Sequence, residues 1–252
     1  MKAIDRIKKI KKDILNPINE IRAKDVSENL DELGRIYGTD KIGTHYYTAH
    51  YKVHFESFRS RKINLLEIGV GGYDKPFSGG KSLRMWKKYF PEGNIFSIDI
   101  YDKSALQEER IRIFQGSQAD RVFLNKVCDE IGGLDIIIDD GSHINEHVIE
   151  SFRILFPRLN DGGIYVVEDT NTSYWPEYGG DSTNLDNPGT SMNFFKKLTD
   201  SLNHKEFLIP GYQASYFDEH IVAMHFYHNI IFIYKGKNDE KTNIPKKVQK
   251  EI

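Results

Sequence analysis

The chain has 252 residues, of which 39% are hydrophobic and 29% are charged, a composition typical of a globular protein. Its 35 Lys and Arg residues nearly balance its 37 Asp and Glu residues, so no overall basic field points to a nucleic-acid partner. The single cysteine, Cys128, excludes an intramolecular disulfide and a cysteine-rich zinc site. No apolar run approaches the about 20 residues that cross a bilayer, and no signal peptide is evident, so we expect a cytoplasmic protein.

Residues 1–60 are predicted to form an N-terminal helical appendage with a loop that covers the cofactor. Isoleucines recur there at helical spacing: Ile4, Ile7, Ile10 and Ile14. Pro17 is expected to interrupt this helix or to start a second short turn. We favour docking of the helix on its own domain or on a partner subunit, and a membrane-surface helix is the alternative, because lysines line its polar face. Residues 37–51, rich in Gly, Thr, His and Tyr, are expected to form an ordered loop between helices.

Residues 61–236 alternate between apolar strand patterns and helical patterns and are predicted to be the catalytic domain. The first five strands are expected at 64–70, 94–100, 111–117, 134–140 and 164–169. The helices between them are expected at 82–90, 121–131 and 144–159. The pair Gly162–Gly163 is expected to turn the chain into the fifth strand. Nearly continuous apolar strands joined by helices favour an α/β fold, a parallel sheet with helices on both faces.

The last part of this domain is predicted to add two strands to the sheet. A long aromatic, glycine-rich loop extends to residue 186, and a helix is expected near 190–203. Two apolar segments then meet at His228–Asn229 as an antiparallel hairpin. Residues 237–252 are expected to form a flexible tail.

The ends of the first three strands predict a nucleoside-cofactor site. Glycines after the first strand let the backbone turn tightly and approach a ligand. Asp99 ends the second strand, where a carboxylate can accept hydrogen bonds from both ribose hydroxyls. The third fingerprint glycine of NAD sites is absent, and a doubly wound domain with ordinary glycine turns is the structural alternative. The predicted cofactor residues are Glu67, Gly69, Gly71, Asp99, Ser117, Gln118 and Asp139, with Thr39 and Lys41 reaching the cofactor from residues 37–51.

Acidic pairs end the fourth and fifth strands and predict a metal site. Asp139 and Asp140 end one strand, and Glu168 and Asp169 end the other. Capping of the next helix would explain one acid at each end but not two. Carboxylates that converge repel one another, so a cation should neutralise them, and oxygen ligands favour Mg²⁺ or Mn²⁺. A histidine, His143, would also admit Fe²⁺ or Co²⁺.

His143 is the predicted general base, with Asp140 as its metal-binding catalytic partner. It follows Asp140 by three residues, and an imidazole with an ordinary pKa of about 6.5 can accept a proton near neutral pH. A metal lowers the pKa of a bound hydroxyl, so both groups act on one proton. The structural alternative for His143 is a residue that bonds backbone near a helix N-terminus, and His147 is the other candidate base.

The chain resembles the metal-dependent sugar O-methyltransferases of macrolide pathways, such as those acting on mycinamicin and tylosin precursors. The resemblance covers about two-thirds of the chain, including YGTDK (37–41), LEIGVGGYD (66–74), FQGSQAD (114–120), DDGSHINEHVIESF (139–152) and VVEDTNTSYWPEYGG (166–180). It implies a Rossmann-like class I fold with a mostly parallel, seven-stranded sheet ending in an antiparallel hairpin, and S-adenosylmethionine (SAM) as cofactor. It also implies that Asp140, Glu168 and Asp169 bind Mg²⁺ and that His143 is the base.

The acidic spacing is also similar to that of catechol-type O-methyltransferases, whose metal ligands follow the first Asp by 28 and 29 residues. Here 168 − 140 = 28 and 169 − 140 = 29, with His143 in the place of their catalytic Lys. One departure concerns the N-terminus, because macrolide enzymes of this type can carry a large extra domain there. The Lys-, Ile- and Asn-rich composition resembles that of a low-GC bacterium. The predicted acceptor is therefore a nucleotide-activated or glycan sugar of capsule or surface-polysaccharide synthesis, with a macrolide or other natural-product deoxysugar as the alternative.

Aromatic residues after the predicted metal ligands are expected to bind the acceptor. Tyr174, Trp175 and Tyr178 offer flat faces for sugar rings, and Gly179–Gly180 would let the segment move as a lid. Two other functions stay open. His143 with two acids is similar to the facial triad of metal-dependent hydroxylases, and a non-catalytic binding protein could keep the fold. A homo-oligomer is also open.

Overall fold

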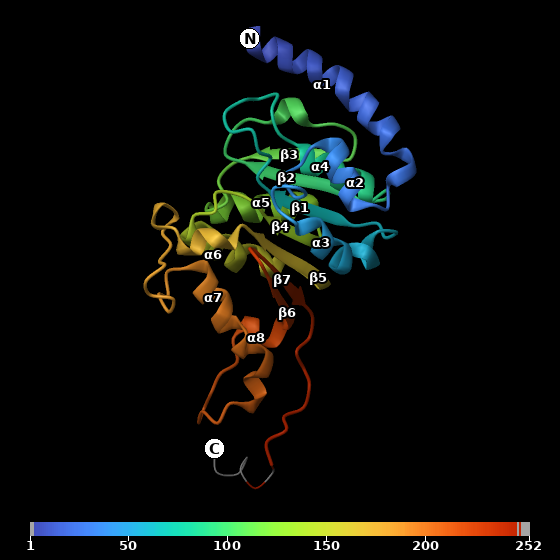
Figure 1. Ribbon diagram of the computed structural model, residues 1–252. Helices are drawn as coiled ribbons and strands as arrows, with labels where there is room; N and C mark the ends of the chain where they lie inside the picture. Colours follow the sequence, from blue (N-terminus) through green and yellow to red (C-terminus); the bar gives the residue numbers. More distant parts are fainter. Residues whose placement is uncertain (1–2, 246, 248–252) are drawn as a thin grey trace. The chain divides into compact units, whose positions relative to one another are not determined.

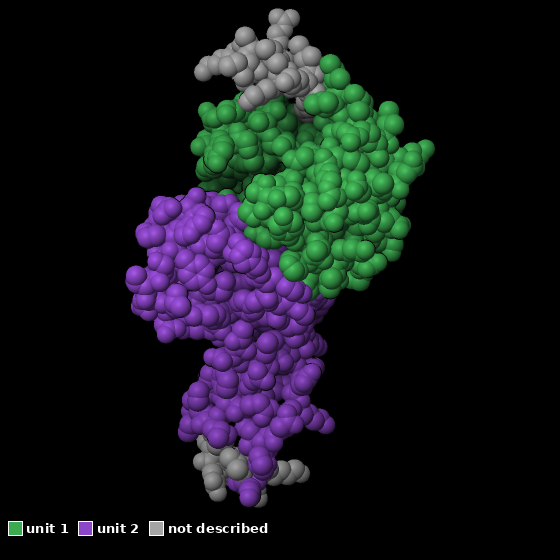
Figure 2. Space-filling model, in the orientation of Figure 1, with its two compact units in different colours: residues 1–141 green, residues 142–252 purple. Residues whose placement is uncertain are grey.

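The structure is a computed structural model that describes residues 3–245 and 247, with the backbone alone for residues 3–8 and 10–13 (Figure 1). It separates into two compact units, Met1–Gly141 and Ser142–Ile252, which Figure 2 colours differently. The boundary falls inside the segment that we predict to be one catalytic domain. Of the predicted tail, 237–252, residues 246 and 248–252 lie outside the described residues. Among the described helices, none combines the length and the apolar character that crossing a bilayer needs.

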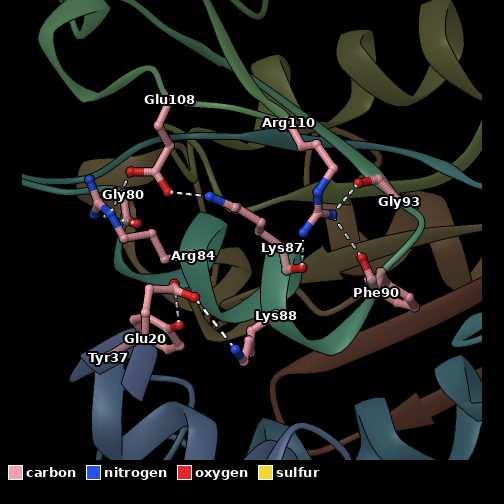
Figure 3. Close-up of polar contacts among 10 residues, drawn as sticks. All are labelled: Glu20, Tyr37, Gly80, Arg84, Lys87, Lys88, Phe90, Gly93, Glu108 and Arg110. Atoms are coloured by element: carbon pink, nitrogen blue, oxygen red, sulfur yellow. Dashed lines mark hydrogen bonds and ion pairs between the residues drawn. The ribbon is translucent and has the colours of Figure 1, made fainter. Parts of the chain in front are cut away.

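The first unit begins with helices α1 (Ala3–Arg22), α2 (Leu30–Tyr37) and α3 (Tyr47–Phe55). The expected interruption at Pro17 is wrong: this exposed proline lies inside α1, which continues at the loss of one backbone hydrogen bond. Glu20 near the end of α1 accepts hydrogen bonds from the Tyr37 hydroxyl, at 2.7 Å, and the Lys88 ammonium, at 3.5 Å (Figure 3). The predicted loop over 37–51 is too long, because α3 already begins at Tyr47.

Four parallel strands form the sheet of the first unit, in the order β3-β2-β1-β4. They are β1 (Asn64–Ile68), β2 (Asn94–Asp99), β3 (Ile111–Gln115) and β4 (Leu134–Asp139), with helices α4 (Lys81–Tyr89) and α5 (Arg121–Ile131) between them. Aromatic rings of α3 and α4 pack together, with Tyr51 and Phe55 within 4.9 and 5.7 Å of Trp86 between ring centroids. The carboxyl ends of these parallel strands all point to one edge of the sheet, where the predicted cofactor residues lie.

The second unit contains β5 (Leu159–Glu168), β6 (Ile221–Tyr227) and β7 (Ile230–Lys235), with β7 antiparallel to both others. Its helices are α6 (Asn145–Leu155), α7 (Ser191–Leu198) and α8 (Tyr216–His220). The predicted hairpin at His228–Asn229 is confirmed, and Asn229 takes the positive φ, 63°, that such tight turns need. The predicted turn at Gly162–Gly163 is wrong: both glycines lie within β5, where Gly162 has a φ of 81°.

Candidate functional site

A glycine-rich loop, residues 69–80, follows β1 where we predict the cofactor. Gly69 has a φ of 96°, and a Cβ there would lie 2.2 Å from the Asp140 carbonyl oxygen, so no larger residue fits. Gly71 also has a positive φ, 76°, but a Cβ there would meet nothing within 4 Å. Space therefore stays open beside Gly71, as a backbone that approaches a ligand requires.

Two buried cations hold this loop in place. The Lys103 ammonium donates to the carbonyl oxygens of Lys75, at 3.0 Å, and Ser78, at 3.1 Å. The Arg84 guanidinium donates to the Gly80 carbonyl at 2.9 Å and pairs with Glu108 at 3.3 Å (Figure 3). Both cations belong to the first unit, so this unit by itself fixes the loop.

Asp99 ends β2, as predicted, and its carboxylate faces the start of the glycine-rich loop. The Val70 N–H donates to Oδ2 at 3.0 Å, and the Tyr101 N–H donates to Oδ1 at 2.9 Å. The residue is half-buried. Because a carboxylate accepts about four hydrogen bonds, both oxygens can still accept from a ribose diol.

The predicted cofactor residues Ser117 and Gln118 lie after β3, and Asp139 ends β4. Gln118 and Asp139 are nearly buried, and the Gln118 amide donates to Asp139 Oδ1 at 3.1 Å. Ser117 accepts a hydrogen bond from the Ala119 N–H at 3.2 Å. The structure therefore brings Gln118 and Asp139 together, with the half-buried Ser117 next to them in the chain.

Three more predicted residues form a buried ionic cluster in the first unit. The Lys41 ammonium lies 2.7 Å from Asp140 Oδ2 and 3.3 Å from Glu67 Oε1. Glu67 is fully buried and accepts a hydrogen bond from the Trp86 indole at 2.9 Å. Burial raises the pKa of Glu67 to about 7, although Lys41 opposes the rise. Thr39, also predicted, accepts from the Lys41 backbone N–H at 3.4 Å.

In the second unit, His143 and Asp169 face each other with 3.6 Å between Nε2 and Oδ2. Both have left-handed backbones, with φ values of 58° and 52°. Such conformations cost about 1–3 kcal/mol each in residues other than glycine and cluster at functional sites. Glu168, at the end of β5, is buried. The other candidate base, His147, contacts the Ser142 hydroxyl through Nδ1 at 3.0 Å.

The predicted acceptor residues Tyr174 and Tyr178 end two short 3₁₀ helices, Thr170–Tyr174 and Pro176–Tyr178, and Trp175 lies between these helices. Trp175 is 45% exposed, and its ring lies 6.0 Å from that of Tyr178 between centroids. The buried Asn145 fixes this segment, because its amide donates to the Thr172 and Tyr178 carbonyls at 3.2 and 2.9 Å. Asn145, Arg84 and Lys103 were not predicted from the sequence, although Asn145 lies within the segment 139–152 that carries the family resemblance.

The comparisons with known proteins point to one family. No protein-family model matches the sequence. Mycinamicin VI 2''-O-methyltransferase of Micromonospora griseorubida is 48% identical over 214 residues, 84% of this chain and 54% of that protein. Demethylmacrocin O-methyltransferase of Streptomyces fradiae is 48% identical over 216 residues, with the same coverages. An 8-demethyl-8-alpha-L-rhamnosyl tetracenomycin-C 2'-O-methyltransferase of Streptomyces olivaceus is 48% identical and covers 80% of this chain and 53% of that protein.

A solved structure agrees with these relatives. MycE methyltransferase from the mycinamycin biosynthetic pathway, in complex with Mg and SAH, has a TM-score of 0.83 and 48% identity, covering 86% of this chain and 58% of that one. The chain thus spans about half the length of the relatives it matches. The predicted fold is confirmed. Over the matched length, the chain is similar to the macrolide and tetracenomycin sugar O-methyltransferases, and it has a class I methyltransferase fold.

Proposed function

We propose that the chain is a SAM-dependent, divalent-metal-dependent O-methyltransferase that acts on a sugar hydroxyl. The observation that carries this proposal is the pair His143–Asp169, held 3.6 Å apart on two left-handed backbones. The matched relatives are named as O-methyltransferases, and the matched MycE structure contains Mg and SAH. To remove the proton of a hydroxyl group at a metal site, an enzyme needs a base, and a neighbouring carboxylate holds that base in place.

The donor set suits a hard divalent cation. Asp140, His143 and Asp169 each offer one ligand atom and are partly exposed. We propose Asp140, Glu168 and Asp169 as the ligands, because carboxylate oxygens suit Mg²⁺ and Mn²⁺. That choice leaves the imidazole of His143 to act as a base.

Each remaining residue then has a role in the reaction. A bound divalent ion would lower the pKa of the acceptor hydroxyl, and SAM would supply the methyl group. His143 Nε2 accepts the hydroxyl proton, and Asp169 orients the imidazole. Asp99 binds the ribose of the cofactor beside the glycine-rich loop, and Gln118 with Asp139 bounds the adenine side. Trp175 and Tyr178 bind the faces of the acceptor sugar.

The comparisons favour a natural-product sugar as the acceptor. The relatives act, by their names, on mycinamicin VI, demethylmacrocin and a rhamnosyl tetracenomycin. The alternative from the sequence, a natural-product deoxysugar, is therefore better supported than the nucleotide-activated or capsule sugar, which no compared protein supports. We propose a deoxysugar carried on a small natural product. The hydroxylase and the non-catalytic protein gain no support, and the cytoplasmic location and a homo-oligomer stay predictions.

A methyl-transfer assay tests this proposal. The protein is incubated with labelled SAM, Mg²⁺ or Mn²⁺, and two acceptor sets, glycosylated polyketides and nucleotide sugars. We expect products that gain one methylene from the first set only, and no product in excess EDTA. His143→Ala should lower kcat by about 10²–10⁴-fold, because a general base contributes about that much. His147→Ala, the matched control, should stay within a few-fold.

Three results would contradict the proposal. Full turnover in metal-free buffer would exclude a role of the metal ion in the reaction. Oxygen uptake without SAM would revive the hydroxylase. Methylation confined to the nucleotide sugars would restore the capsule-type acceptor while keeping the chemistry.

A further inference from the structure

Lys41 is a buried cation on the loop between α2 and α3, and this loop fixes its backbone. Its side chain is 1% exposed. Its carbonyl oxygen accepts hydrogen bonds from the N–H groups of Tyr47, at 3.1 Å, and Thr48, at 3.3 Å, which begin α3. The main chain of Lys41 therefore caps a helix, while its ammonium points into the first unit.

The ammonium of Lys41 lies between two carboxylates. It is 2.7 Å from Asp140 Oδ2 and 3.3 Å from Glu67 Oε1, and the Trp86 indole holds the other oxygen of Glu67 at 2.9 Å. Lys41 and Glu67 are essentially without solvent contact, whereas the Asp140 side chain is 25% exposed. The row Trp86–Glu67–Lys41–Asp140 thus runs from the core to the edge of the sheet, and Asp140 is its accessible end.

We propose that Lys41 is a positioning residue that fixes the carboxylate of Asp140 for the metal ion, and that Glu67 supports it. This inference rests on the proposed function, in which Asp140 is a metal ligand. The hydrogen bond to Oδ2 uses one of about four acceptor positions of the carboxylate, so Asp140 can still bind a cation. The ionised form of Glu67 balances the charge of Lys41, so Lys41 can orient Asp140 with little net repulsion of the incoming ion. Partners that orient metal ligands in this way raise metal affinity.

Measurements of metal binding to the full chain distinguish an orienting role of Lys41 from an effect of its positive charge. Mn²⁺ affinity is measured by electron paramagnetic resonance, and SAH affinity by calorimetry. Lys41→Met removes the orienting group and one positive charge. The double variant Lys41→Met/Glu67→Gln, compared at pH 8 where Glu67 is mostly ionised, removes both charges of the pair and leaves the local net charge unchanged. We expect both variants to bind Mn²⁺ about 10–100-fold more weakly, the usual loss for an orienting partner, and to bind SAH within two-fold of the unaltered protein.

A second buried lysine provides the matched control. Lys103 is also 1% exposed, but it holds the carbonyls of the glycine-rich loop. Lys103→Met should therefore weaken SAH binding and leave Mn²⁺ binding within two-fold. Circular dichroism verifies that each variant is folded, and the double variant leaves no unpaired buried charge if Lys41→Met alone does not fold.

Distinct outcomes would overturn the proposal. If Lys41 acted by charge alone, Lys41→Met would tighten Mn²⁺ binding and the double variant would leave it unchanged. If Lys41 contacted the cofactor, as the sequence predicts, SAH binding would fall while Mn²⁺ binding stayed. If the unaltered protein did not bind Mn²⁺ at all, the metal role in the proposed function would fail. Unchanged Mn²⁺ binding in both variants of an active protein would refute the role of Lys41 alone.

Discussion

Glu67 shows how one buried acid connects the core with the candidate site. Its pKa is raised from 4.5 to about 7, chiefly because burial disfavours the carboxylate; Lys41 lowers the pKa, and Asp140 raises it. The folded protein therefore keeps a proton that the unfolded chain releases between these pH values. The contribution of Glu67 to the free energy of unfolding is present below about pH 4.5 and is lost as the pH rises through 7.

This pH dependence can be measured with Glu67→Gln, which cannot ionise. At about 1.4 kcal/mol per pKa unit, the rise from 4.5 to about 7 corresponds to about 3 kcal/mol. The free energy of unfolding of the variant, relative to the unaltered protein, should increase by about 2–3 kcal/mol between pH 5 and pH 8. Urea titrations in EDTA at both pH values measure it. An equal difference at the two pH values would contradict a raised pKa.

At the scale of elements, hydrogen bonds to α6 and α7 anchor residues 170–181, the acceptor segment, which contains the predicted acceptor residues. Asn145, the first residue of α6, makes three hydrogen bonds: two to carbonyls of the segment and one from the Ser191 N–H, at 2.7 Å, which begins α7. The Ser173 hydroxyl also lies 2.7 Å from that of Ser191. One buried amide thus joins α6, α7 and the acceptor segment.

Asn145→Ala should loosen this segment. The loss removes the amide partner of the buried Ser191 N–H and of the Tyr178 carbonyl, so the free energy of unfolding should fall by about 2–3 kcal/mol. Amide hydrogen exchange across 170–181 should quicken. Asn125→Ala is the matched control, because Asn125 donates only to its own helix, at 2.8 Å to the Arg121 carbonyl, and should change stability by at most about 0.5 kcal/mol. Unchanged exchange in Asn145→Ala would show that Asn145 does not anchor the segment.

The elements differ in how well the sequence predicts them, for local reasons. The helix predicted at 121–131 is confirmed at both ends, because Asp120 caps its start and Gly132 follows its last residue. The hairpin also forms for a local reason, because Asn229 adopts the positive φ of a tight turn. The predictions at Pro17 and at Gly162–Gly163 are wrong. Proline disfavours a helix and glycine disfavours a strand, but the hydrogen bonds of neighbouring residues can continue α1 through Pro17 and β5 through the two glycines.

Side-chain partners far apart in the sequence were harder to predict. The acids that end β4 and β5 could be assigned to strand ends from the sequence, because each pair follows a continuous apolar run. The contact of Lys41 with Asp140 joins residues 99 positions apart, and no periodicity encodes it. The same holds for Asn145, whose partners lie 27 to 46 positions away.

For the whole molecule, the proposed metal site predicts a thermal shift. An ion that binds only the folded chain stabilises it by about 2.7 kcal/mol when its concentration is 100 times its Kd. For a chain of this size, that corresponds to a rise of about 5–10 °C in Tm. Calorimetry with Mn²⁺ should show this rise in the unaltered protein and little in Asp140→Asn. A rise of the same size in that variant would place the ion elsewhere.

Gly69 and Gly71, in the loop after β1, are required for different physical reasons, and this difference predicts how each position would change in evolution. Gly69 is required by a carbonyl of its own unit, because a Cβ there would lie 2.2 Å from the Asp140 carbonyl oxygen, whereas Gly71 is favoured only by its positive φ of 76°. Such a backbone costs most other residues about 1–2 kcal/mol, and Asn and Asp adopt it more readily. In a descendant that had abandoned methyl transfer, selection on the architecture would hold position 69 to glycine, whereas position 71 would admit Asn or Asp. Replacement of Gly71, with Gly69 retained, would therefore mark a lineage that kept the scaffold and gave up the chemistry.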